Sequence, residues 1–225
     1  MKYSSEWRRV FGDVDPAVTV REIAFLRRVL PAPPARVLDV ACGPGRHVRA
    51  LGELGYEAAG VEVDDAVAAA ARREGLDVRT LDMRDLRSLE GEFDAVVSMW
   101  ASFGFFDDAT NADVLRAMAA KLRAGGVLVL DVYDPSFFGP SWSGDRVVRG
   151  VNVHEEKEVR GNRLHGRISY DGEPRDQQEW RLYSADEIAA LVPELELVTA
   201  CAGWDEARAA AGTEPRMQLV LRRPR

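Results

Sequence analysis

The sequence has few cysteines and no long apolar run. Cys42 and Cys201 stand far apart and form neither a disulfide framework nor a CxxC metal clip, so we expect two buried thiols in a reducing compartment. The longest apolar stretches are too short to span a bilayer, and residues 1–10 lack the apolar core of a secretory signal. These absences exclude a disulfide-stapled fold and predict a cytoplasmic protein that is not embedded in a membrane.

Positive charge is also in deficit. The chain carries 30 Lys and Arg against 37 Asp and Glu, a net charge of −7. Proteins that bind phosphate backbones usually carry a basic excess, so a nucleic-acid partner is disfavoured and a small-molecule partner is favoured. Hydrophobic residues make up 46% of the chain, an ordinary globular share, and 225 residues suit a single domain over residues 1–225.

Short apolar runs alternate with helical patterns between residues 15 and 133. Strands are predicted at residues 36–41, 58–63, 78–81, 93–99 and 127–133. Asp15-Pro16 and Asp64 are helix starts, and Gly75 ends the helix that Asp64 begins. Strands rich in Val and Leu and separated by helices predict a parallel sheet with helices on both faces.

The pattern changes after Tyr133. Residues 146–183 alternate polar and apolar around two turn signals, which predicts two or three antiparallel strands in an inserted segment, residues 134–183. A capping box at Ser184 opens a helix, and residues 195–201 and 217–221 form a closing strand pair. The expected fold is α/β, with a Rossmann-like, seven-stranded, mostly parallel sheet whose last strand is antiparallel. The inserted strands either cover a substrate or form a dimer edge, so a monomer and a homodimer both remain open.

The N-terminal segment, residues 1–30, is predicted to be helical. Tyr3, Trp7 and Phe11 recur at a spacing of four residues and so lie on one helix face. This stripe fits an amphipathic helix docked on the body. It equally fits a lid that closes over a ligand and excludes water.

A glycine-rich turn follows the first strand of the sheet. Gly43 and Gly45 let the backbone take positive φ and approach a ligand, and the following helix begins with free N–H groups. In a parallel sheet this turn lies in the ligand crevice. A dinucleotide fingerprint requires Gly or Ala where Val48 stands, and the acid Asp39 inside the strand suits a ligand with an ammonium group and hydroxyls.

Residues 38–47, LDVACGPGRH, resemble the first motif of class I S-adenosylmethionine-dependent methyltransferases, in a bacterial small-molecule branch. The resemblance implies S-adenosyl-L-methionine as cofactor and methyl transfer to an O, N or C nucleophile of a small molecule. Glu62 would then bind both ribose hydroxyls, Asp82 the adenine amino group, and Met83 would offer backbone and apolar contact. The implied cofactor-binding residues are Asp39, Ala41, Gly43, Gly45, Glu62, Val63, Asp82, Met83 and Ser98. An alternative at Asp82 is that Asp85 simply caps a helix there.

The acceptor site is expected beyond the fourth and fifth strands. The candidate acceptor-binding residues are Tyr3, Trp7, Trp100, Phe103, Tyr133, Arg181 and Tyr183. The fourth strand is not followed by the Asn/Asp-Pro-Pro-aromatic run typical of enzymes that methylate DNA bases or amides. An acidic cluster resembling the magnesium site of catechol-type enzymes is also missing, so a metal-independent reaction is expected.

His47 is the candidate general base. It lies in the first turn of a helix, where the dipole disfavours a protonated imidazole, although it could equally be a histidine at a helix start beside the cofactor. His154 and His165 are expected at the surface. Two rival functions stay open. One is a nicotinamide-dependent oxidoreductase, disfavoured by Val48 and Asp39, and the other is a non-catalytic protein that binds S-adenosylmethionine.

Overall fold

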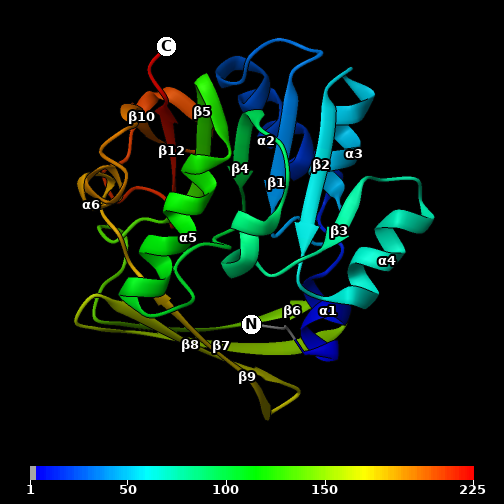
Figure 1. Ribbon diagram of the computed structural model, residues 1–225. Coiled ribbons are helices and arrows are strands. Elements are labelled where there is room, and N and C mark those ends of the chain that lie inside the picture. Colours follow the sequence, from blue (N-terminus) through cyan, green and yellow to red (C-terminus); the bar gives the residue numbers. More distant parts are fainter. Residues whose placement is uncertain (1–3) are drawn as a thin grey trace.

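The computed structural model describes residues 4–225, in which the chain forms an eight-stranded main sheet and a four-stranded small sheet (Figure 1). Tyr3, an expected acceptor residue, lies outside the described residues. The main sheet contains β1 (Arg36–Val40), β2 (Glu57–Glu62), β3 (Val78–Thr80), β4 (Phe93–Ser98), β5 (Leu122–Tyr133), β10 (Glu196–Ala202), β11 (Asp205–Ala209) and β12 (Arg216–Arg222). The small sheet contains β6 (Ser141–Val148), β7 (Val151–Arg160), β8 (Arg163–Tyr170) and β9 (Glu173–Arg181).

The main sheet has the order β11-β10-β12-β5-β4-β1-β2-β3. The neighbours from β5 to β3 pair in parallel, while β12 runs antiparallel between β5 and β10, as expected for the last strand. The predicted count of seven strands is wrong by one, because β11 adds to the free edge of β10. This strand has the sequence DEARA, whose mostly exposed side chains carry no apolar alternation.

Helices cover both faces of the main sheet, as predicted. The helices are α1 (Ser5–Phe11), α2 (Pro16–Val29), α3 (Arg46–Glu53), α4 (Asp65–Arg73), the 3-10 helix η1 (Met83–Ser88), α5 (Asp108–Ala120) and α6 (Ala185–Leu191). One apolar core packs α5, α6 and η1 against the sheet, and a second packs α2 and α3 against its other face. Asp15, Asp64 and the Ser184 capping box start their helices as the sequence predicts.

The small sheet crosses beneath the end of the main sheet toward which the β2 arrow points in Figure 1. The inserted segment holds four antiparallel strands, rather than two or three, in the order β6-β7-β8-β9. The sequence pattern predicts strands only from residue 146, which leaves out the first half of β6. This half was not predicted because β6 is an edge strand with mostly exposed residues. This placement brings the small sheet to the carboxyl ends of the parallel strands, where α/β proteins bind ligands.

The two helices of the N-terminal segment pack on different sheets. Helix α2 packs on the main sheet, whereas α1 packs Trp7, Val10 and Phe11 against the apolar part of β7 and β8. From α1, the Arg8 guanidinium pairs with Asp64, the N-cap of α4, at 2.7 Å. Helix α1 therefore bridges the small sheet and the region beside the carboxyl end of β2.

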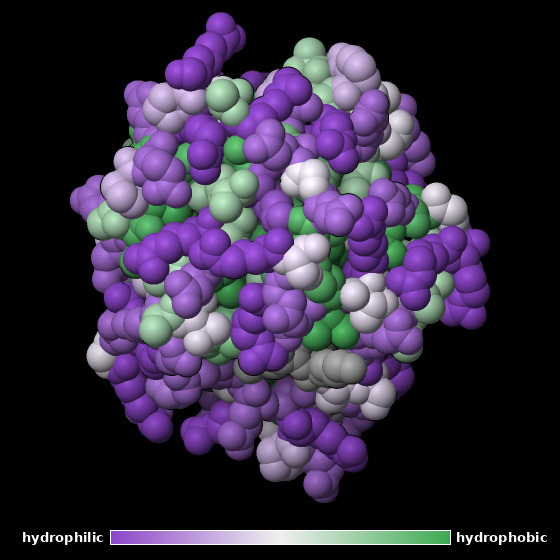
Figure 2. All heavy atoms as spheres, viewed as in Figure 1, coloured by the Kyte–Doolittle hydropathy of each residue, from purple (hydrophilic) through white to green (hydrophobic). Residues whose placement is uncertain are grey.

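The surface in the view of Figure 2 is mostly hydrophilic, with hydrophobic side chains visible in scattered patches. Trp142 in β6 is one of the larger apolar side chains left accessible, at 53% exposure. Within residues 4–225, the helices are all too short or too polar to cross a membrane.

Alanine substitutions at two glycines near the turn after β1 are expected to change stability in opposite directions. A Cβ atom on Gly60, which is buried in β2, would lie 2.5 Å from Cys42 Sγ and 3.1 Å from Val48 Cγ2. Gly60→Ala should therefore lower the free energy of unfolding by about 1–3 kcal/mol, through overpacking. Gly52 in α3 has nothing within 4 Å of the equivalent position, so Gly52→Ala should raise stability by about 0.5–1 kcal/mol. Urea unfolding of both variants measures these changes, and equal effects would contradict the packing described for Gly60.

Candidate functional site

The turn after β1 is built from residues with left-handed backbone conformations. Ala41, Gly43 and Gly45 have φ values of 62°, 56° and 80°. A Cβ on Gly45 would lie 2.7 Å from Leu76 Cδ1, so only glycine fits without displacement. A Cβ on Gly43 would meet nothing within 4 Å, so this part of the turn faces open space. Gly45 is also the N-cap of α3, and its lack of a side chain leaves the first N–H groups of that helix available to a ligand.

Glu62 ties this turn to the end of β2. One carboxylate oxygen accepts the Gly43 N–H at 3.1 Å, and the other accepts the Asp64 N–H at 2.8 Å. Each oxygen retains further acceptor capacity, so the half-buried carboxylate can also accept from ligand hydroxyls. The structure thus brings together Gly43, Glu62 and Val63, as the motif analysis expected.

Asp39 and Ser98 present buried polar atoms on the neighbouring strands β1 and β4. Asp39 is 2% exposed and Ser98 is fully buried. Neither the Asp39 carboxylate oxygens nor Ser98 Oγ has a hydrogen-bond partner among residues 4–225. A buried polar group without a partner is costly, and a bound molecule that reached these atoms would complete their hydrogen bonding.

Asp82 is engaged within its own turn. It is the N-cap of η1 and accepts from the backbone N–H of Arg84 at 2.9 Å and from its guanidinium at 2.6 and 3.1 Å. The hydrogen bond from Arg84 is the main reason why the pKa of Asp82 is lowered. The alternative that Asp85 caps this helix is wrong, because Asp82 does so. Met83 packs its side chain against the core on the α5 face.

A buried carboxylate from α2, Glu22, organises the region beside this turn. It is fully buried and accepts from His47 Nε2 at 2.9 Å, from Trp100 Nε1 at 2.6 Å and from the Arg46 guanidinium. Burial by itself raises the pKa of Glu22. The hydrogen bonds from His47 and Arg46 outweigh burial and lower the pKa to about 2, so Glu22 is ionised.

His47 lies between two carboxylates. Its Nε2 bonds to Glu22, and its Nδ1 is 3.6 Å from Asp39 Oδ2. Burial lowers the pKa of His47, but the two acids outweigh it and the net pKa is raised. Both ring nitrogens face acceptors, so the surroundings of His47 favour the imidazolium and oppose the expected effect of the helix dipole.

The segment after β4 makes a tight turn held by β5. Trp100 and Ala101 have φ values of 60° and 51°, and the Ser102 N–H bonds to the Met99 carbonyl at 3.3 Å. The fully buried Asp131 carboxylate accepts the Trp100 N–H at 2.9 Å, while its backbone carbonyl accepts the Ala101 N–H at 2.9 Å. These bonds hold two non-glycine residues in a left-handed conformation at the carboxyl end of the sheet.

Asp131 in turn depends on β12. Gln218 Nε2 donates to its carboxylate at 2.9 Å, and the Arg216 guanidinium forms an ion pair with it. Burial raises the pKa of Asp131, and Arg216 opposes that rise. The Trp100 indole lies between Arg46 and Arg216, whose guanidinium carbons are 5.0 and 5.3 Å from its ring centroid. Trp100 therefore links the Glu22 and Asp131 carboxylates.

Three expected acceptor residues are engaged inside the protein. Phe103 is 3% exposed and packs on Tyr183 with ring centroids 5.5 Å apart. Arg181 stacks 4.4 Å from the Tyr183 ring and pairs with Glu187 of α6 at 2.5 Å. The structure assigns Phe103, Arg181 and Tyr183 to a cluster that docks the end of β9 on α6, rather than to an open pocket.

The other acceptor candidates lie nearer the space between the sheets. Tyr133 packs edge-on against Phe138 and Trp180, at 5.4 and 5.0 Å between centroids, and so lies between β5 and the small sheet. Trp7 contributes to the apolar cluster of α1 and the small sheet. Sequence reasoning missed Glu22, Asp131, Arg216 and Gln218. A usable signal existed for Asp131, because it interrupts an apolar strand as Asp39 does.

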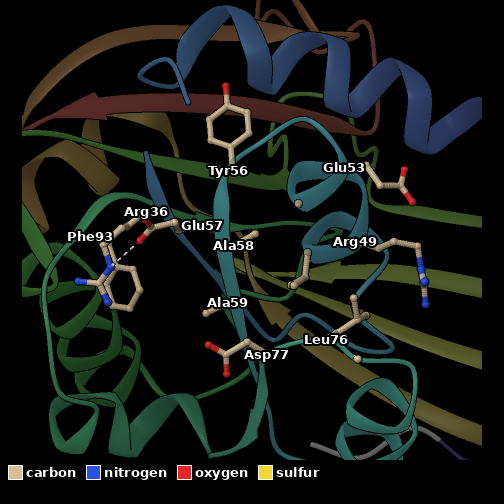
Figure 3. A pocket seen from close by; sticks show the side chains of 13 residues that line it. Arg36, Arg49, Glu53, Tyr56, Glu57, Ala58, Ala59, Leu76, Asp77 and Phe93 are labelled. Atoms are coloured by element: carbon tan, nitrogen blue, oxygen red, sulfur yellow. Dashed lines mark ion pairs between the residues drawn. The ribbon is translucent and has the colours of Figure 1, made fainter. Parts of the chain in front are cut away.

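A cavity of about 530 Å³ opens at the other end of the main sheet (Figure 3). Its lining includes Arg36, Glu57 and Phe93, which begin β1, β2 and β4, and Arg36 and Glu57 form an ion pair there. It therefore lies at the opposite end of the sheet from the carboxyl ends of the parallel strands, and its lining contains none of the candidate site residues. Among the described residues, no group of three or more His, Cys, Asp or Glu side chains is arranged to hold a metal ion.

Comparisons with known proteins agree with this geometry. Residues 37–126 match a family model described as a methyltransferase domain. The chain is 34% identical over 140 residues to dTDP-3-amino-3,4,6-trideoxy-alpha-D-glucopyranose N,N-dimethyltransferase from Streptomyces venezuelae. That match covers 60% of this chain and 58% of the relative, so the chain spans little more than half the length of this relative.

Solved structures extend the likeness to nearly the whole chain. A sugar N-methyltransferase from a Streptoalloteichus species is 29% identical with a TM-score of 0.67, covering 100% of this chain and 94% of that one. The S-adenosylmethionine-bound amino pentose methyltransferase from Micromonospora echinaspora is 26% identical with a TM-score of 0.71, covering 99% and 98%.

The Glu22 contacts predict a pH-dependent stability. Glu22→Gln removes the charge that His47 and Arg46 share, and should lower the free energy of unfolding by about 3–5 kcal/mol at pH 7. The folded pKa of Glu22 is depressed from 4.5 to about 2, so its contribution is present above pH 4.5 and is lost as pH falls toward 2. Urea unfolding from pH 7 to 3 should show the wild-type advantage shrinking below pH 4.5.

The matched control is Glu6→Gln, which alters a surface pair of α1 with Arg9. It should leave stability nearly unchanged at every pH. Parallel curves for wild type and Glu22→Gln throughout this range would show that the carboxylate is not held in its charged form.

Proposed function

Since this chain belongs to the class I S-adenosylmethionine-dependent methyltransferase superfamily, we propose that it transfers a methyl group from S-adenosylmethionine to a nucleophilic O, N or C atom of a small molecule. The observation that carries the proposal is the pair of buried polar side chains Asp39 and Ser98, beside a glycine turn whose Gly43 N–H bonds to Glu62. Ser98 Oγ has no partner in the described chain, and the Asp39 carboxylate has only the His47 ring at 3.6 Å, so both retain acceptor capacity for a bound molecule.

The residues of the crevice fit this cofactor. Glu62 would accept from both ribose hydroxyls, and the Asp39 carboxylate would receive the ammonium group of the methionine part. Asp82 and Met83 would contact the adenine. The rest of the cofactor site would be lined by Ala41, Gly43, Gly45, Val63 and Ser98. When bound, the cofactor supplies a methyl group that is already activated by a positively charged sulfur.

The protein's main task is then orientation. Holding two reactants in line can supply ~7–11 kcal/mol, whereas a general base adds ~10²–10⁴-fold only when the acceptor loses a proton at the transition state. Both ring nitrogens of His47 face carboxylates, Nε2 toward Glu22 and Nδ1 toward Asp39, so neither is free to take a proton from an acceptor. We therefore assign His47 a positioning role, in which it fixes the Asp39 carboxylate beside the cofactor.

Two segments would enclose the site. Helix α1 joins the small sheet to Asp64 at the carboxyl end of β2, and this contact supports a lid role for the N-terminal segment of residues 1–30. The small sheet of residues 134–183 would cover the acceptor. Both expected cysteine thiols are free and buried, which fits action in a reducing cytoplasm.

The first acceptor class to test is amino sugars, because the relatives named above include an amino-sugar N,N-dimethyltransferase, a sugar N-methyltransferase and an amino pentose methyltransferase. Incubation with S-adenosylmethionine and a panel of nucleotide-linked amino sugars, neutral sugars and phenols should yield S-adenosylhomocysteine, measured by mass spectrometry. Turnover of any panel member supports an enzyme. Tight binding without turnover on any acceptor would favour a binding protein instead.

Glu62 tests cofactor binding. Glu62→Ala should weaken S-adenosylmethionine binding roughly thirtyfold or more, because two charge-assisted hydrogen bonds are lost. Glu57→Ala is the control, since Glu57 begins the same strand with a 65% exposed side chain, and it should bind normally. Calorimetric titration with S-adenosylmethionine, S-adenosylhomocysteine and NAD(H) measures this. A preference for NAD(H) would overturn the proposal.

Kinetic measurements on a His47 variant distinguish a positioning role from a role as general base. His47→Gln should raise the Kd and KM for S-adenosylmethionine about tenfold, without changing the shape of the pH–kcat profile. His154→Gln, whose side chain is 40% exposed on β7, should change neither. A loss of ~10²–10⁴-fold in kcat at unchanged KM, with one limb of the pH profile removed, would identify His47 as the base after all.

A further inference from the structure

The face of the small sheet that packs on the protein body has a polar middle between two apolar clusters. Val151, Val153, Ile168 and Tyr170 form one cluster with α1, and Leu164 and Trp180 form the other with Tyr133 and Phe138. Alternation along the strands places Glu155 and Lys157 of β7, Gly166 of β8 and Gln178 of β9 between these clusters on the same face. This middle region lies beneath the carboxyl end of the main sheet (Figure 1).

Lys157 fills this region with its own cation. Its Nζ lies 5.5 Å from the ring centroid of Tyr133 and 5.8 Å from those of Phe138 and Trp142. The Glu155 carboxylate is 3.0 Å from the same atom, and the two side chains are only 17% and 13% exposed. Several aromatic rings and a carboxylate around one ammonium group are the arrangement by which proteins bind organic cations.

Two glycines make room for the rings. A Cβ on Gly144 would lie 2.8 Å from the Trp142 ring, and a Cβ on Gly166 would lie 3.3 Å from the Trp180 ring. Glycine inside a strand weakens the strand and often marks the close approach of another group. Gln178 Nε2 adds a buried donor that has no acceptor within the described chain.

We propose that Tyr133, Phe138, Trp142 and Glu155 form a binding site for an organic ammonium group, which Lys157 occupies when the ligand is absent. The ligand class is a small molecule with an amine, in its protonated or N-methylated form. This assignment rests on the proposed function, because it makes the site a subsite for the ammonium group of the methylated product, or for a second, non-reacting ammonium group of the acceptor. Lys157 must leave the rings for the ligand to enter, so its ammonium competes directly with the ligand.

The test uses a cation and its neutral isostere. Choline and 3,3-dimethylbutan-1-ol have the same shape and differ in charge. Lys157→Met removes the competing ammonium and keeps the apolar stem, so it should bind choline roughly tenfold more tightly than wild type and gain nothing for the alcohol. Trp142→Ala in the Lys157→Met background should abolish the gain. Arg160→Met, which removes a 59% exposed cation from the same strand, should bind choline as wild type does.

Titration calorimetry and tryptophan fluorescence on the full chain measure these affinities. Equal binding of choline and the alcohol, or no gain in Lys157→Met, would overturn the site. If the Lys157→Met variant does not fold, Lys157→Gln replaces it. The same gain in choline affinity, with no gain for the alcohol, is then expected of Lys157→Gln. S-adenosylmethionine is titrated into the same samples. Its failure to bind wild type would count against the proposed function, while the choline comparison would still decide the ammonium site.

Discussion

The carboxyl-end crevice depends on the charge of one buried carboxylate. Glu22 can stay ionised in the interior only while it is surrounded by donors, and these come from the start of α3 and the turn after β4. The carboxylate therefore fixes α2, His47 and Trp100 relative to one another. Asp39 lies 3.6 Å from the His47 ring, and Asp131 accepts the Trp100 N–H, so paired buried charges as well as apolar packing hold these segments together.

Much of the fold could be predicted, because its signals are local. The strands β1, β4 and β5 contain buried apolar runs rich in Val, Leu and Ala. Asp15, Asp64 and Ser184 mark helix starts through side-chain caps that act within three residues. The strands that escaped prediction, β11 and the first half of β6, lie at sheet edges. Edge strands bury little side-chain surface, so their position depends on a partner strand and not on an apolar alternation of their own.

The residues of the candidate site also fall into a group that the sequence predicts and a group that it does not. Asp39, Gly43 and Glu62 lie at or just after the carboxyl ends of neighbouring strands, so the sequence motifs predict that they lie close together. Glu22 and Asp131 act through partners that are distant in sequence, and spacing does not reveal such contacts. Arg181 and Tyr183 were expected in a pocket because polar and aromatic residues occur together there, but Glu187 and Phe103 provide partners that draw them into the interior.

The position of β12 has a consequence for how the protein is made. This strand, residues 216–222, inserts between β5 and β10 in the middle of the main sheet. It also supplies Arg216 and Gln218, which hold the Asp131 carboxylate and through it the turn at Trp100. During synthesis, the crevice cannot be completed until these late residues leave the ribosome. The nascent chain must therefore keep this edge of β5 unpaired from the time β5 is made until β12 follows, a state prone to aggregation and suited to chaperone binding.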